Sequence, residues 1–105
     1  MRDLVFDDMT RCTPAEVARL LPLVSVQRRE QALRFSHTFG QFCCLKSYEM
    51  LLTLLREWGM EHPTAPAFAA PPSFVYNEHG HPRLGTGPFF SISHCRQAIA
   101  VGVSD

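Results

Sequence analysis

The sequence has 105 residues, which is enough for one small domain and excludes a chain that folds into two complete lobes. Apolar residues make up 46% of it and charged residues 19%, so we expect a folded domain and not a disordered chain. Ten Lys and Arg residues balance ten Asp and Glu residues, which excludes the overall positive field of a dedicated nucleic-acid-binding protein.

The cysteines and the apolar runs indicate the compartment. Cys12, Cys43, Cys44 and Cys95 include no CxxC pair, so we expect neither a zinc site nor a disulfide framework. No charged-then-apolar leader opens the chain, and no apolar run approaches the ~18 residues of a membrane span. We therefore expect a cytoplasmic protein without a membrane partner.

The first third of the chain predicts one short strand and two helices. Residues 4–6 form an apolar run of β-formers, which predicts an edge strand. Thr13-Pro14-Ala15-Glu16 has the form of a capping box, so a helix is expected over residues 14–21. Ser25 can cap a second helix that runs through Arg34.

A long central helix is predicted over residues 39–58, where apolar side chains recur at helical spacing. These positions are Phe39, Phe42, Cys43, Met50, Leu51, Leu54, Leu55 and Trp58. Gly59 is expected to end the helix. Prolines in the alanine-rich residues 59–73 disfavour regular structure, so this stretch is expected to be a connection across the surface.

Short strands are expected in the last third of the chain. Residues 74–76 and 82–84 predict a hairpin around a turn in which Gly80 takes a positive φ. Residues 89–94 and 98–104 predict a second antiparallel hairpin, joined at Cys95-Arg96-Gln97. Helices followed by strands predict the α+β class, with a three- or four-stranded antiparallel sheet packed on the central helix.

The strand at residues 98–104 has two different faces. Alternation puts Ile99, Val101 and Val103 on one face and alanine and glycine on the other, and the small-residue face is expected to let a helix approach closely. No cap, turn or polar tail follows the strand, so we expect it to leave an unpaired sheet edge through which the chain self-associates.

His94 is the first candidate for a functional side chain. Residues 90–94, Phe-Ser-Ile-Ser-His, alternate so that His94 faces away from Ser93 and is the last residue before the bend. A protonated imidazole at a strand end favours a phosphate ligand, whereas the alternative is a structural histidine that closes the hairpin. Cys95 cannot share a proton with His94, because adjacent strand residues point to opposite faces.

Two segments of the chain resemble the Sfp-type 4′-phosphopantetheinyl transferases. Tyr76-Asn77-Glu78-His79-Gly80-His81-Pro82-Arg83-Leu84, leading to Phe90-Ser91-Ile92-Ser93-His94, is similar to the family's glycine-lysine-proline turn followed by its serine-histidine strand. Ser25 through Lys46, with Arg28-Arg29-Glu30 and Arg34-Phe35, is similar to the basic helices ahead of the family's sheet. Without the serine-histidine strand, these arginines are also explained as a solvated helix face.

The resemblance implies a binding site for the phosphates of coenzyme A. Arg28 matches a family lysine at the 3′-phosphate, and His94 matches the histidine that meets the same phosphate. Ser93 matches the adjoining serine near the nucleotide.

Other positions of the implied site depart from the family's pattern. Gln31 stands where a second lysine can occur, and Cys44 stands where a small polar residue contacts phosphate. In the Gly80-His81-Pro82 turn, His81 replaces the lysine that usually reaches the nucleotide. Lys46, two residues after Cys44, is expected to replace some of the lost charge.

The implied activity is transfer of the 4′-phosphopantetheine arm of coenzyme A to a serine of an acyl or peptidyl carrier protein, in fatty acid, polyketide or nonribosomal peptide biosynthesis. The family's Mg²⁺ ligands and its catalytic glutamate and lysine lie in a second half. Residues 1–105 are therefore expected to be an N-terminal lobe that has no catalytic residue or metal ligand and is inactive alone. The rival hypothesis is a non-enzymatic protein-interaction module that uses the exposed sheet edge.

Overall fold

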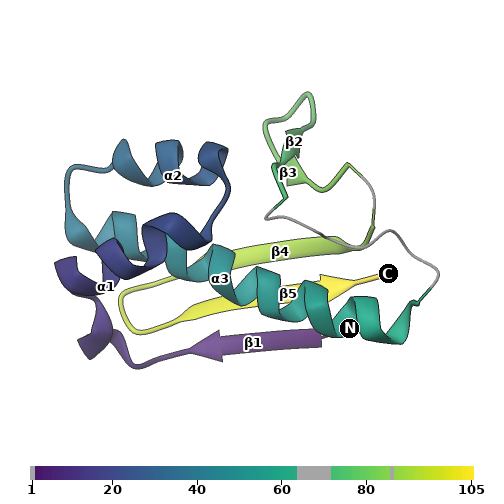
Figure 1. The fold of residues 1–105 in the computed structure, drawn as a ribbon, viewed down its shortest axis with the longest axis horizontal. Helices are drawn as coiled ribbons and strands as arrows, with labels where there is room; N and C mark the ends of the chain where they lie inside the picture. The colour runs from purple at the N-terminus through teal and green to yellow at the C-terminus, as the bar shows by residue number, and fades with distance from the viewer. Residues whose placement is uncertain (1, 64–71, 86) are drawn as a thin grey trace.

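The computed structural model describes residues 2–63, 72–85 and 87–105, which fold into an α+β domain. A small antiparallel sheet packs on one long helix, and two shorter helices pack on that helix (Figure 1). This arrangement confirms the predicted fold class.

The elements follow the predicted order, helices before most strands. The helical elements are η1 (Met9–Arg11), α1 (Pro14–Leu20), η2 (Leu21–Leu23), α2 (Val26–Leu33) and α3 (Thr38–Glu61), of which η1 and η2 are 3₁₀ turns. The strands are β1 (Arg2–Phe6), β2 (Val75–Tyr76), β3 (Pro82–Arg83), β4 (Phe89–His94) and β5 (Ile99–Ser104).

The first two helices begin where their caps were predicted. The Thr13 hydroxyl accepts from the Glu16 amide, and the Ser25 hydroxyl accepts from the Arg28 amide. The predicted capping box is only half formed, because the Glu16 carboxylate pairs with Arg19 instead of reaching back to Thr13.

Helix α3 is longer at both ends than predicted. At its start, His37 Nδ1 accepts from the Gly40 amide at 3.0 Å, so a histidine acts as the N-cap. The prediction that Gly59 ends the helix is wrong. The helix continues to Glu61 and the amide of His62 donates to the Gly59 carbonyl, because the residue before Pro63 is the first one biased away from the helical region.

Strand β5 lies in the middle of the three-stranded sheet, whose order is β1-β5-β4 (Figure 1). It pairs antiparallel with β1, where Arg2 lies opposite Val103, and with β4, where Phe89 lies opposite Ser104. The prediction that this last strand leaves an unpaired edge is therefore wrong. Self-association through this strand loses the unpaired edge on which it was expected, and it stays a prediction. The outer strands are β1 and β4.

The helix packs on the branched face of β5, not on its small-residue face. Ile99, Val101 and Val103 are buried in the core with the apolar residues of α3. On the opposite face, a Cβ added to Gly102 would lie 2.8 Å from Asp3 Oδ1 and 3.2 Å from a Ser91 oxygen. Small residues on β5 therefore make room for neighbouring side chains, and the prediction that they receive a helix is wrong.

The β2–β3 hairpin forms a separate two-stranded sheet. Its turn is fixed by Asn77, whose side-chain oxygen accepts from the amides of His79 and His81, each at 2.9 Å. Gly80 has a φ of 77°, as the turn requires. The Pro/Ala-rich connection begins later than predicted, since residues 59–61 are helical, and residues 64–71 of it lie outside the described residues.

Within the part of the chain that the structure describes, no helix is both long and apolar enough to cross a membrane.

Candidate functional site

A hollow of about 380 Å³ brings together four of the side chains singled out in the sequence. Arg28 and Gln31 come from α2, Cys44 comes from α3, and His94 comes from the end of β4. The rest of the lining is mostly apolar and consists of Phe35, Gly40, Cys43, Ser47 and Ile92. Helix α3 thus contacts both α2 and β4, which are far apart in the sequence, and residues of all three elements line the same hollow.

Arg28 is a half-buried cation held entirely by neutral acceptors. Its guanidinium donates to the Cys44 carbonyl at 3.0 Å, to Gln31 Oε1 at 3.2 Å and to Ser47 Oγ at 3.2 Å. It also lies 5.6 Å from the centre of the Phe74 ring. Among the described residues no carboxylate pairs with it, so its charge is available to an anion in the hollow.

Cys44 contributes a neutral thiol to the hollow. Burial raises the pKa of this thiol, and the nearby Arg28 only partly opposes that rise. The neighbouring Cys43 is more strongly affected, since burial raises its pKa to about 11. Neither cysteine therefore places a negative charge beside Arg28 at neutral pH, and a thiol can donate weakly to an anion.

His94 is exposed at the opposite wall, with its ring edge-on to Phe39 at a centroid distance of 6.1 Å. The bond that closes the β4–β5 hairpin is made by the next residue, whose amide donates to the Ala98 carbonyl at 2.9 Å. Within the described residues the imidazole of His94 has no hydrogen bond. The ring is therefore available to a ligand, and a role in closing the hairpin is not needed to explain its position.

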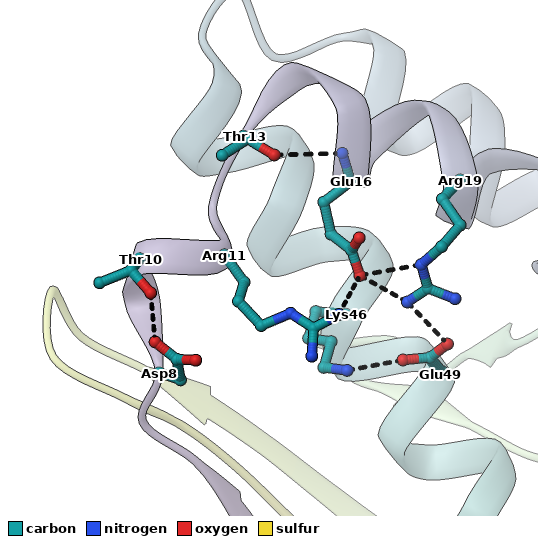
Figure 2. A network of polar contacts seen from close by, with 8 residues as sticks. All are labelled: Asp8, Thr10, Arg11, Thr13, Glu16, Arg19, Lys46 and Glu49. Carbon is teal, nitrogen blue, oxygen red and sulfur yellow. Dashed lines mark hydrogen bonds and ion pairs between the residues drawn. The ribbon is translucent and has the colours of Figure 1, made fainter.

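Lys46 is directed away from the hollow. Its ammonium lies 2.7 Å from Glu49 and 4.5 Å from the centre of the Phe6 ring. Glu49 also bonds Arg19, which pairs with Glu16 and so ties α1 to α3 (Figure 2). The lysine belongs to this network of ion pairs, and the structure does not bring it to the side chains it was expected to assist.

Ser93 also lies apart from the hollow. In β4 it faces away from Ile92 and His94, as the alternation of the strand predicts, and it is exposed on the sheet face opposite α3. Of the serine-histidine pair, the structure therefore directs only the histidine toward Arg28.

The Gly80-His81-Pro82 turn borders a second and larger hollow of about 680 Å³. His81, Pro82 and Arg83 form one wall, and residues 89–92 of β4 form the other. Ile92 lines both hollows, so the two spaces lie next to each other along β4. The turn does not line the hollow that holds Arg28.

Two glutamines attach the β2 strand to α2, and one of them was missed in the sequence. The Gln27 side chain makes a pair of bonds to the Phe74 backbone, at 2.7 and 3.1 Å. One turn later, Gln31 donates to the Tyr76 hydroxyl while accepting from Arg28. Their spacing of four residues puts both on one helix face, which was the available signal.

The hollow between α2, α3 and β4 is lined by basic and neutral side chains. Arg28 and His94 line it, and none of the described lining residues is acidic. No group of three His, Cys, Asp or Glu residues in the described ranges is arranged to hold a metal ion. The arrangement of Arg28 and His94 around the hollow can bind an anion.

No protein-family model matches the chain, and no curated protein matches it either.

Proposed function

We propose that the chain binds the 3′-phosphate of coenzyme A in the hollow between α2, α3 and β4, as the N-terminal lobe of a 4′-phosphopantetheinyl transferase. The observation that carries the proposal is the half-buried guanidinium of Arg28, which has only neutral partners among the described residues and lies in one hollow with His94. A phosphate monoester would supply the missing negative charge, and two guanidinium N–H groups remain to donate to it.

The substrate class is proposed from the resemblance together with this geometry. The 3′-phosphate distinguishes coenzyme A from most nucleotides, so a site for that group would select the substrate before any chemistry occurs. The described residues do not fit a Mg²⁺ site, because they hold no suitable group of three ligands. We therefore assign the binding of Mg²⁺ and the attack by the carrier-protein serine to a reaction that needs a second lobe. The proposed compartment is the cytoplasm.

The test is a calorimetric titration of the chain with coenzyme A and with dephospho-coenzyme A, which lacks only the 3′-phosphate. We expect saturable binding of coenzyme A and at least about tenfold weaker binding of the dephospho form, since a charge-assisted contact contributes roughly 1.5–3 kcal/mol. Equal affinity for the two ligands, or no saturable binding of either, would contradict the proposed site.

A transfer assay tests the second half of the proposal. Incubation of the chain with coenzyme A, Mg²⁺ and an apo acyl carrier protein should give no mass gain on the carrier, because the described residues include no metal-binding acidic group. Modification of the carrier at a rate typical of enzymes would show that this chain is complete, and the assignment of chemistry to another lobe would then be wrong.

A further inference from the structure

The outer edge of β4 is a second feature that points to a ligand. Cys95 and Ala98 form a hydrogen-bonded pair at the end of the hairpin, and β4 and β5 pair antiparallel throughout. In an antiparallel ladder the hydrogen-bonded pairs recur at every second residue. Ser93 and Ser91 therefore bond inward to β5, whereas the backbone groups of Phe90, Ile92 and His94 point outward from the sheet.

These outward groups have no backbone partner among the described residues. Figure 1 shows β4 at the border of the three-stranded sheet, on the side of the β2–β3 hairpin. Phe90 and Ile92 line the 680 Å³ hollow between β4 and β3, so the unpaired edge borders this space. An edge with a hollow beside it is suited to an added strand.

The side chains around this hollow define the kind of strand that fits. On the face toward α3, Phe90 and Ile92 are partly buried against the core, which favours apolar side chains in a neighbouring strand. On the other face Arg83 lies 5.5 Å from the centre of the exposed Phe89 ring. His81 and Arg83 are basic, and none of the described lining residues is acidic.

We propose that the outer edge of β4 accepts an extended acidic peptide of another protein as an additional strand. Alternate residues of the peptide place apolar side chains beside Phe90 and Ile92 and acidic side chains beside Arg83. The peptide backbone bonds the outward groups of β4. The inference does not rest on the proposed coenzyme A site, because no part of it uses Arg28.

The first experiment uses a capped heptapeptide that alternates valine with glutamate, titrated into the whole chain and followed by amide hydrogen exchange. Binding should slow exchange at the Phe90 and Ile92 amides by about tenfold or more. The Ser91 and Ser93 amides already bond to β5, so they serve as internal controls and should change little. Binding without protection at Phe90 and Ile92, or no binding, would overturn the proposal.

Two N-methylated peptides test strand addition without altering the protein. In one the valine amides are methylated, and in the other the glutamate amides are methylated. Since only one set of amides faces β4 in an added strand, one peptide should keep the affinity of the parent and the other should lose it. Equal binding of the two methylated peptides would overturn the proposal. If both peptides lose affinity, the hydrogen-exchange result with the parent peptide decides whether the proposal stands.

The charge preference has its own controls. A peptide with lysine in place of glutamate should bind more weakly, and Arg83→Ala should weaken the glutamate peptide by about two- to fivefold, as expected for an exposed ion pair. Arg56→Ala removes an arginine from the exposed surface of α3 and should have no effect. Equal losses in the two variants would reject the acidic preference. Protection of Phe90 and Ile92 that rises with protein concentration alone would identify a second copy as the occupant and overturn the proposal.

Discussion

Replacing Arg28 by alanine is the most direct test of the proposed phosphate site. Three of the five N–H groups of the guanidinium are used by Cys44, Gln31 and Ser47, so two remain for a phosphate. A charge-assisted contact contributes roughly 1.5–3 kcal/mol, which corresponds to a loss of about ten- to a hundredfold in affinity for coenzyme A. Affinity for dephospho-coenzyme A should stay nearly unchanged.

The same substitution also removes contacts that support the fold. Each hydrogen bond contributes about 0.5–1.5 kcal/mol, but Ser47 Oγ keeps its bond to the Cys44 carbonyl and Gln31 remains open to water. We therefore expect the free energy of unfolding of Arg28→Ala to fall by roughly 1–3 kcal/mol, measured by urea denaturation. Binding must be measured under conditions in which this variant is fully folded.

Two further variants separate charge from geometry. Arg28→Lys keeps the positive charge but loses the planar fork, so its affinity for coenzyme A should lie between those of the wild type and Arg28→Ala. Arg56→Ala makes the same change of net charge on an exposed part of α3 and should leave affinity within about twofold. Equal losses in Arg28→Ala and Arg56→Ala, or an equal loss for both ligands, would contradict a 3′-phosphate contact at Arg28.

Three other predictions follow from the site and its surroundings. Lys46→Ala should leave coenzyme A affinity within about twofold in a calorimetric titration, because its ammonium pairs with a carboxylate outside the hollow. Pairing with Arg19 holds the pKa of Glu16 below its ordinary value of 4.5, so its stabilising contribution is present above that pH and is lost as pH falls through the lowered value. The free energy of unfolding, measured by urea denaturation at a series of pH values, should accordingly fall less at acid pH in Glu16→Gln than in the wild type. A thiol-reactive dye should label the exposed Cys95 long before Cys43, whose pKa is about 11, and equal rates would show that Cys43 is not buried.

The long helix was predictable because its signal is local and repeated. Its apolar residues contact the sheet on one side and two helices on the other, so apolar positions recur over many turns. A polar residue at one of these positions would not hide the pattern. Its ends were harder to place. A histidine is an uncommon N-cap, and Gly59 has no contact or turn that requires it to stop the helix.

The order of strands was not predictable from local patterns. The pairing of β1 with β5 joins Arg2 to Val103, and no periodicity within either segment specifies which strand it will meet. The sequence therefore predicted both strands while misplacing the free edge of the sheet. The wrong prediction about the small-residue face of β5 has the same cause. Which face of a strand meets the helix depends on how the whole sheet packs, and the alternation within one strand does not specify this.

The placement of Lys46 could have been predicted from helix geometry alone. It follows Cys44 by two residues, and residues two apart on a helix differ by about 200° around the axis. Residues three or four positions from Cys44 share its helix face, and Gly40 and Ser47 meet that condition and do line the hollow. By contrast, the placement of Arg28 and His94 around one hollow depends on how α2 and β4 pack on α3. Only the family resemblance indicated that these two residues share a site.

The two proposed sites are neighbours, because Ile92 lines both hollows. Its outward backbone groups are used in strand addition, while its side chain lies between the apolar walls of the two spaces. A ligand in either hollow therefore lies beside a residue that also lines the other hollow. Any effect of coenzyme A on peptide affinity must be matched by an equal effect of the peptide on coenzyme A affinity, because binding free energies are linked in both directions. Measuring coenzyme A affinity at increasing peptide concentrations would separate true coupling through Ile92 from competition for one site. Competition lowers the apparent affinity without limit because the two ligands cannot bind together, whereas coupling changes it to a finite value once the peptide site is saturated.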